Sequence, residues 1–320
     1  MGILPRRGLD LIRRRLSRLA LSRRDIDRWA VVYLLASGLY PFLGASPPSG
    51  PWPGFLLHSG LALAIWFLPP LARRSPFAAL RLLGETYLPF IFPLFYSEMA
   101  HLGLVFYHQP LDPAFIRLEE SLLGGQPSLG WSTTWPWPWL HELLQLAYFS
   151  YYVWGFVVLA LLLASPAVPA PRRWPAMLAF VRDLSATMLV CYTLYTFFPV
   201  WGPKYFRAGP VEVEGWIFTR LMRQIHEHGA ILGAAFPSSH VAATLVPWWH
   251  AWKNVPCLRA WATLQLVLVA MATVYCRYHY VVDVLGGLLL GGIILVLGEK
   301  YGEREKRQGS LRSGPGPAAI

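Results

Sequence analysis

The chain has 320 residues, of which 55% are hydrophobic and only 14% are charged. Because soluble domains carry about 25% charged residues, this composition excludes an ordinary soluble domain and predicts a multi-pass membrane protein. The net charge of +11 does not indicate nucleic-acid binding, since the basic residues gather before Trp29 and after Leu297. Beside apolar stretches, Lys and Arg set orientation and contact anionic lipid headgroups.

Eight apolar stretches are candidates for membrane spans, each of which needs about 20 mainly apolar residues. In chain order they are 29–45, 54–72, 79–100, 140–164, 176–199, 239–252, 258–275 and 280–298. The sixth stretch is short, and the third contains prolines and Glu98, which is a candidate polar partner of His101. The predicted fold class is all-α, a polytopic membrane helical bundle with about eight transmembrane helices.

The positions of Lys and Arg predict the orientation of these spans. With the N-terminus in the cytoplasm, the loop clusters that fall on the cytoplasmic side are Arg73–Arg74, Arg172–Arg173, and Lys253 with Arg259. This agrees with the excess of positive charge found in cytoplasmic loops. Both termini are then cytoplasmic, and two long external segments remain, at about 101–139 and 200–238. In the first of them we expect a helix at Asp112–Leu123, lying on the membrane.

A histidine and an aspartate stand together where the eighth span begins. His279 and Asp283 are four residues apart in RYHYVVD, so on a helix they share one face. The carboxylate can then bond to one imidazole nitrogen and leave the other as a positioned base or nucleophile. A purely structural polar pair is the alternative, but ionisable groups inside a span are expensive and usually functional.

The sixth span begins with FPSSH, which places two serines and a histidine at a helix start. Ser238 and Ser239 suit an N-cap, and a helix N-terminus with free N–H groups also binds anions. His240 then projects from the first turn toward the same external face as His279. The external cations nearest to these motifs are Lys204, Arg207 and Arg277. This set suits a phosphate ester, although capping alone would also explain the serines.

Three motifs in this order resemble the type 2 phosphatidic acid phosphatase superfamily. They are GPKY from Gly202, FPSSH ending at His240, and RYHYVVD from Arg277 to Asp283. The stretches DPAFIRLEESLLGGQPSL and YFSYY also resemble patterns of the branch that includes inositol phosphorylceramide synthases. The resemblance covers roughly residues 78–298. It implies a six-helix phosphatase-like core.

The resemblance also implies a role for each matching residue. His279 attacks phosphorus, Asp283 orients it, and His240 protonates the leaving oxygen and then activates water or an acceptor alcohol. The residues that hold the phosphoryl oxygens are Lys204, Arg277, Ser238, Ser239 and Arg207. This scheme needs no metal and no cofactor. The sequence departs from the family pattern at Ser239, where many members have glycine, and at Arg277, which lies only two residues before His279.

These observations predict four segments. A basic tail (1–28) precedes two accessory transmembrane helices (29–76), a lipid phosphatase or phosphotransferase core (77–299) and a cytoplasmic tail (300–320) that we expect to be disordered.

The predicted function is a membrane phosphatase or phosphotransferase acting on a phospholipid or a prenyl (di)phosphate from the external face, in a bacterial plasma membrane. Two alternatives stay open. One is transfer of inositol phosphate or another headgroup to a lipid alcohol, and the other is a non-catalytic lipid-binding or transport protein. A metal site at His226 and His228 in the second external segment lacks further ligands. The partners expected are lipid phosphates and membrane lipids.

Overall fold

The computed structural model describes residues 22–43, 50–97, 99–102, 109–206 and 213–312. Within these residues the regular structure is helical, apart from an isolated bridge between Val200 and Ala234. The protein is therefore an all-α polytopic bundle, as predicted. The side chains of Glu98, His101 and Arg207 lie outside the described residues.

The helices, in chain order, are α2 (Arg23–Leu39), α3 (Trp52–Arg73), α4 (Ala78–Thr86), α5 (Leu88–Ser97), α6 (Met99–Leu102), α7 (Asp112–Leu123), α8 (Pro127–Thr134), α9 (Pro138–Ala164), α10 (Ala170–Phe197), α11 (Pro203–Phe206), α12 (Ile217–Gly229), α13 (Ser239–Asn254), α14 (Arg259–Tyr275) and α15 (Val281–Arg312). The expected helix at Asp112–Leu123 is thus present as α7. The expectation of a disordered tail from residue 300 is wrong up to Arg312, because α15 continues through a charged segment in which Tyr301 and Glu305 pair at i,i+4.

Six helical stretches in the described part of the chain are long and apolar enough to cross a membrane: α3, α4 with α5, α9, α10, α14 with the short turn before it, and α15. The other two predicted spans form α2 and α13, with 17 and 16 residues. At about 1.5 Å per residue α13 is about 24 Å long. All eight predicted spans therefore form helices, and six of them meet the length and composition of a full span.

The third predicted span is divided into α4 and α5 at Tyr87. Pro89 has no backbone N–H, so it cannot donate to the carbonyl of Glu85 four residues earlier. The guanidinium of Arg23 at the start of α2 donates to that carbonyl instead, and also pairs with the Glu85 carboxylate at 3.3 Å. The break in this span thus provides an attachment point for the N-terminal helices.

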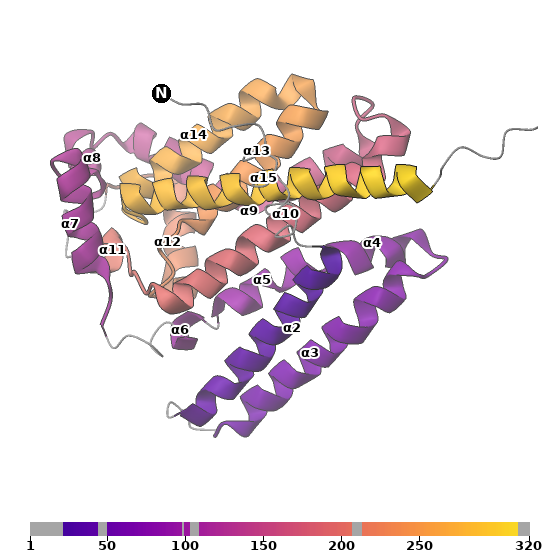
Figure 1. Ribbon diagram of the computed structural model, residues 1–320. Helices are drawn as coiled ribbons and strands as arrows, with labels where there is room; N and C mark the ends of the chain where they lie inside the picture. Colours follow the sequence, from indigo (N-terminus) through magenta and orange to yellow (C-terminus); the bar gives the residue numbers. More distant parts are fainter. Residues whose placement is uncertain (1–21, 44–49, 98, 103–108, 207–212, 313–320) are drawn as a thin grey trace, which may run out of the picture.

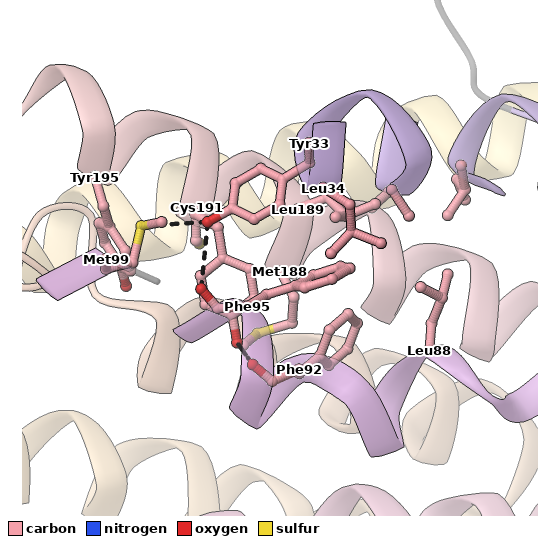
Figure 2. Packing of buried hydrophobic residues seen from close by; sticks show 14 of the residues in the cluster. Tyr33, Leu34, Leu88, Phe92, Phe95, Met99, Met188, Leu189, Cys191 and Tyr195 are labelled. Carbon is pink, nitrogen blue, oxygen red and sulfur yellow. Dashed lines mark hydrogen bonds between the residues drawn. The ribbon is translucent and has the colours of Figure 1, made fainter. Parts of the chain in front are cut away.

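The N-terminal hairpin of α2 and α3 shares a hydrophobic cluster with α5 and α10. Figure 2 shows Tyr33 of α2 in this cluster, where its hydroxyl donates to the Phe95 carbonyl at 3.2 Å. At one end of the hairpin Arg73 pairs with Asp27 at 2.6 Å. The two accessory helices are therefore packed and ion-paired onto the remaining bundle.

The helices outside the spans gather toward one end of the bundle. Figure 1 shows α7, α8, α11 and α12 together at the end where α13 and α15 begin. The opposite ends of α13 and α14 are joined by the turn at Pro256–Leu258. The chain thus brings the segments that follow α10, precede α13 and precede α15 to one end.

Candidate active site

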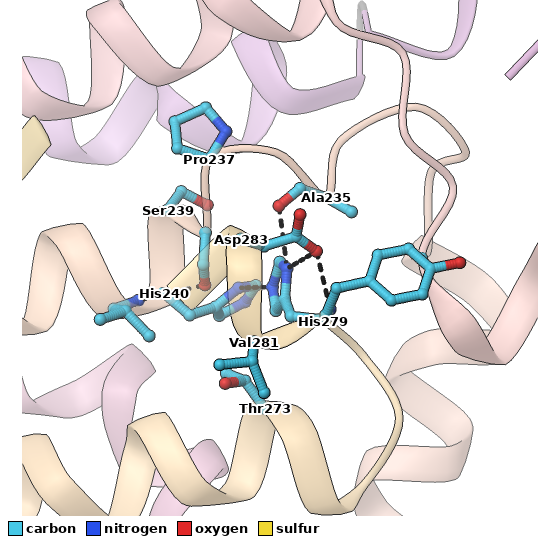
Figure 3. A network of polar contacts seen from close by, with 12 residues as sticks. Ala235, Pro237, Ser239, His240, Thr273, His279, Val281 and Asp283 are labelled. Atoms are coloured by element: carbon cyan, nitrogen blue, oxygen red, sulfur yellow. Dashed lines mark hydrogen bonds and ion pairs between the residues drawn. The ribbon is translucent and has the colours of Figure 1, made fainter. Parts of the chain in front are cut away.

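Two histidines from separate helices meet at this end of the bundle. His240 lies in the first turn of α13, and His279 lies just before α15. Nδ1 of His240 is 3.3 Å from Nε2 of His279. Figure 3 draws this contact as a dashed line between the two rings. His279 is only 3% exposed, whereas His240 is half-buried. The structure therefore brings together two imidazoles that are 39 residues apart in the sequence.

The partners of the two rings define which nitrogen carries a proton. Nδ1 of His279 is 2.9 Å from the carbonyl of Ala235. A carbonyl only accepts, so this Nδ1 carries the hydrogen and Nε2 keeps its lone pair. Nδ1 of His240 then donates to that lone pair, and Nε2 of His240 accepts from the hydroxyl of Tyr148 at 2.8 Å. The lone pair of His279 therefore points at His240.

Asp283 lies behind His279. Its Oδ2 is 3.6 Å from Nδ1 of His279, an ion-pair distance rather than a hydrogen bond. The same oxygen accepts from the backbone N–H of Tyr280 at 2.8 Å, and the residue is fully buried. The sequence predicted that Asp283 itself bonds the ring. The structure shows that Ala235 makes the shorter contact and that Asp283 supplies negative charge beside it.

The two serines are buried at the start of α13. The Ser238 hydroxyl accepts from the backbone N–H of Val241 at 3.4 Å. The backbone N–H of Ser238 donates to the Asp283 carbonyl at 2.9 Å. The N–H of Ser239 donates to the hydroxyl of Tyr195 at 3.2 Å. Ser238 therefore caps the helix as predicted and also fastens the start of α13 to that of α15.

The first and third motifs lie in contact through their backbones. The N–H of Lys204 donates to the carbonyl of Arg277 at 2.9 Å, and the Lys204 ammonium lies 5.3 Å from the centre of the Tyr278 ring. Arg277 has the left-handed φ of 65°, and its guanidinium donates to the Pro203 carbonyl at 3.4 Å. Of the three predicted phosphate-binding cations, Lys204 and Arg277 are among the described residues. Both lie beside Tyr278, the residue before His279.

α7 holds the first and third motifs in place. Fully buried Asp112 accepts from the N–H groups of Trp201 and Gly202 at 2.8 and 2.9 Å and from the Tyr280 hydroxyl at 3.0 Å. Seven residues later Glu119, also fully buried, accepts from the N–H of Val281 at 2.6 Å. One helix outside the spans thus fixes the two loops that carry Lys204 and His279.

A cavity of about 440 Å³ adjoins His240. It is lined by His240, Ser239 and mainly aromatic and aliphatic side chains of α5, α9 and α10. Along α9 its lining runs from Tyr148 to Leu159, a helix length of about 16 Å. A long apolar space beside a reactive imidazole suits a ligand that carries an alkyl chain.

Comparison with known proteins gives the family of this site. A family model described as the PAP2 superfamily matches residues 113–297, more than half of the chain. The chain belongs to the PAP2 superfamily. It is also 26% identical over 226 residues to a PA-phosphatase related-family protein of Dictyostelium discoideum. That match covers 65% of this chain and 39% of the relative, and no solved structure matches.

Some residues of this PAP2 site had no role assigned from the sequence. Tyr148 lies in YFSYY and Asp112 and Glu119 lie in DPAFIRLEESLLGGQPSL, two stretches that resembled family patterns. Asp112 and Glu119 are acidic residues in a helix predicted to lie on the membrane. Their position there was the sequence signal that could have marked them as residues of the site. No local signal marks the carbonyl of Ala235 as a histidine partner, because the two residues are 44 positions apart.

A further helix outside the spans, α12, covers part of the site of this PAP2 protein. Glu142 of α9 accepts from the N–H groups of Trp216, Phe218 and Thr219 at 2.6–3.2 Å, and so caps the start of α12. At the other end of α12, His226 stacks on Tyr278 with ring centres 4.2 Å apart. Within the described residues no three metal-ligating side chains are grouped.

The buried carboxyl group of Glu119 gives this PAP2 protein a pH-dependent stability. Burial raises the pKa of Glu119 to about 7, the Val281 N–H opposes this shift, and the charge of Asp283 adds to it. In the unfolded chain the group titrates near 4.5. The folded protein therefore binds the extra proton, and its stability falls as pH rises from about 4.5 to about 7, by up to roughly 3 kcal/mol.

Replacing Glu119 with glutamine keeps the acceptor for Val281 and removes this titration. We expect Glu119→Gln to melt several degrees above the wild type at pH 8 and at the same temperature at pH 5, in a thermal scan of the detergent-purified protein. Exposed Glu120 on the same helix provides the control, and Glu120→Gln should follow the wild type at both values. An equal shift at pH 5 and pH 8 would contradict a role for ionisation.

Proposed function

We propose that the protein transfers phosphate from a membrane lipid through a covalent phosphohistidine on His279. The observation that carries this proposal is the pair of imidazoles, with nitrogens 3.3 Å apart, beside an apolar cavity of about 440 Å³ in a PAP2 chain. The lone pair of Nε2 on His279 faces the cavity-lining His240. The two rings move apart when the reacting phosphate enters between them. The cavity offers room for the lipid chain.

The reaction proceeds in two half-reactions. Nε2 of His279 forms the N–P bond as the bond from phosphorus to the leaving oxygen breaks. His240, which takes a proton from solvent on Nε2 as the phosphate binds, gives its Nδ1 proton to that oxygen and keeps the proton on Nε2. Water or an acceptor alcohol then gives a proton back to Nδ1, its oxygen bonds to phosphorus, and the N–P bond breaks. Asp283 stabilises the positive charge that develops on His279.

The phosphoryl oxygens need positive groups around them, because preorganised donors dominate phosphoryl transfer. We assign this role to Lys204 and Arg277, whose backbones are joined beside His279. Arg207, Ser238 and Ser239 belong to the same proposal as sequence-predicted phosphate ligands. Of the two serines, Ser239 lines the cavity, whereas the Ser238 hydroxyl is engaged as a cap.

The orientation of the enzyme is also part of the proposal. The site lies where α10 ends and α13 begins, and the basic clusters at Arg172–Arg173 and Lys253 lie at the opposite ends of these helices. The positive-inside rule supports a site on the external face and both termini in the cytoplasm. We propose a bacterial plasma membrane as the location.

A lipid alcohol is a second candidate for the acceptor in place of water. The apolar lining beside His240 favours it, because a lipid acceptor can enter from the membrane through the same cavity. Transfer of inositol phosphate from phosphatidylinositol to ceramide or diacylglycerol is the form of this reaction that the sequence resemblance suggests. The two acceptors share the phosphohistidine and differ only in the second half-reaction.

Purified protein in lipid vesicles tests the proposal with phosphate-labelled phosphatidate, a prenyl diphosphate and phosphatidylinositol, each with and without ceramide or diacylglycerol. We expect turnover of at least one donor and, after rapid quenching, a protein label that is acid-labile and base-stable, as a phosphorus–nitrogen bond is. Release of inorganic phosphate without an acceptor indicates a phosphatase, and a labelled lipid product only with an acceptor indicates a transferase. Binding without turnover or label would favour a lipid-binding or transport protein.

A further inference from the structure

The hydroxyl of Tyr148 is bound to the nitrogen of His240 that faces away from His279. It lies 2.8 Å from Nε2, and the two rings are tilted by 30° with centres 4.6 Å apart. Tyr148 is 2% exposed, and its ring also packs on Tyr278 at 4.5 Å. The ring contact with Tyr278 therefore holds Tyr148 in addition to the hydrogen bond with His240.

This contact leaves His240 with one nitrogen for chemistry. Nδ1 is directed at Nε2 of His279, where phosphorus is attacked, while Nε2 is covered by Tyr148. If the hydroxyl were absent, Nε2–H of the imidazolium would be buried without an acceptor. The charged ring, which is the form that gives up the Nδ1 proton, would then be disfavoured.

We propose that Tyr148 is a positioning residue that reserves Nδ1 of His240 for proton exchange with the reacting phosphate. This inference rests on the proposed phosphoryl transfer. In the first half-reaction the Nδ1 proton passes to the leaving oxygen, and Nε2–H of His240 stays bonded to the tyrosine oxygen. In the second, Nδ1 takes a proton from water or the acceptor alcohol, so that His240 regains the proton it lost.

A tyrosine suits this position because its hydroxyl can either donate or accept. It donates to Nε2 when the resting ring is neutral, and it accepts from Nε2–H when the ring is an imidazolium. A carboxylate at this place would instead hold the ring permanently in its charged form. Phenylalanine would leave Nε2 facing an apolar ring.

Tyr148→Phe tests the proposal through the dependence of rate on the leaving group. We use purified protein in single-turnover experiments with dodecyl phosphate, whose alkoxide needs a proton, and 4-nitrophenyl phosphate, whose phenolate does not. The variant should release dodecanol about 10- to 100-fold more slowly than the wild type, the effect of leaving a buried group without its hydrogen bond. Release of nitrophenol should change less than about threefold by the same reasoning.

Two further variants distinguish a specific effect of Tyr148→Phe on His240 from a general loss of folded protein. Tyr33→Phe removes a buried hydroxyl from α2, far along the chain from the site, and should leave both rates at the wild-type level. In a His240→Gln background, Tyr148→Phe should cause no further loss, because its only effect is exerted through His240. A variant that is merely misfolded would lose both substrates equally and would add its loss to that of His240→Gln.

The outcomes separate this inference from the proposed function. Equal loss with both leaving groups, wild-type rates in Tyr148→Phe, or additive loss with His240→Gln would each overturn the role of Tyr148 while phosphoryl transfer stands. Absence of turnover and of a protein label in the wild type would overturn the proposed function itself. The expected pattern is a defect confined to the alkyl leaving group and abolished by His240→Gln.

Discussion

Replacing His279 with alanine is expected to lower lipid phosphate turnover by about 10⁴-fold or more and to abolish the covalent protein label. The reason is that His279 supplies the lone pair that forms the bond to phosphorus, and loss of a nucleophile removes a complete reaction route. The measurement is steady-state turnover together with rapid-quench labelling of the protein in vesicles. The folded state of the variant is checked by its elution and melting temperature.

A second histidine–aspartate pair of the same chain provides a matched control. Nε2 of buried His250 lies 2.9 Å from Oδ2 of Asp183, on α13 and α10 at the end remote from Tyr148 and His240. His250→Ala should reduce the melting temperature and yet keep the label on the folded fraction. A label that survives in His279→Ala, or that disappears in His250→Ala, would contradict the assignment of the nucleophile.

Replacing Gly202 with alanine is expected to separate the first motif from the third. Gly202 has a φ of 88°, and a Cβ atom on it would lie 2.6 Å from the carbonyl oxygen of Tyr278. That oxygen belongs to the backbone beside His279, so it cannot move without moving the loop. We expect at least a tenfold loss of turnover, because small displacements of catalytic groups reduce rates strongly, together with a lower melting temperature.

Gly124→Ala is a control that separates the effect of the clash at Gly202 from the free-energy cost of a positive φ in alanine. Gly124 at the end of α7 has a φ of 71°, but a Cβ atom there would meet nothing within 4 Å. Both substitutions carry a cost on the order of 1 kcal/mol for the left-handed conformation, and only Gly202→Ala adds the clash. Equal losses of activity in the two variants would show that the close approach of Gly202 to the Tyr278 carbonyl does not affect turnover.

The helices of the bundle could be predicted because their signals are local. Apolar stretches of span length and a helix-start signal at Ser238 are each contained within one segment, and α7 formed at the predicted residues. The end of α15 was predicted wrongly, because disorder was expected from residue 300 and the helix continues to Arg312. The prediction relied on the Gly, Ser and Pro residues near the terminus and not on the charged residues before them, which are helical. Local composition therefore predicted which helices form better than where the last one ends.

The site could be predicted in its residues but not in its contacts. Spacing and the family resemblance brought His240, His279 and Asp283 together in one hypothesis, and the structure places them side by side. The partners that decide proton positions are a backbone carbonyl at Ala235 and a hydroxyl at Tyr148, 44 and 92 residues from the histidines they bind. Such contacts follow from packing of distant helices, on which a single sequence carries no direct information.

The dependence of the motifs on α7 has a consequence for biogenesis. Asp112 and Glu119 emerge from the ribosome long before the Tyr280 hydroxyl and the Val281 N–H that they bind. Until the last helix enters the membrane, Glu119 lacks the Val281 N–H, and Asp112 has the N–H groups of Trp201 and Gly202 but not the Tyr280 hydroxyl. Insertion of α15 therefore both completes the site and allows α7 to settle, so that a chain which fails this final step stays inactive and displays an incompletely docked acidic helix to quality-control proteases.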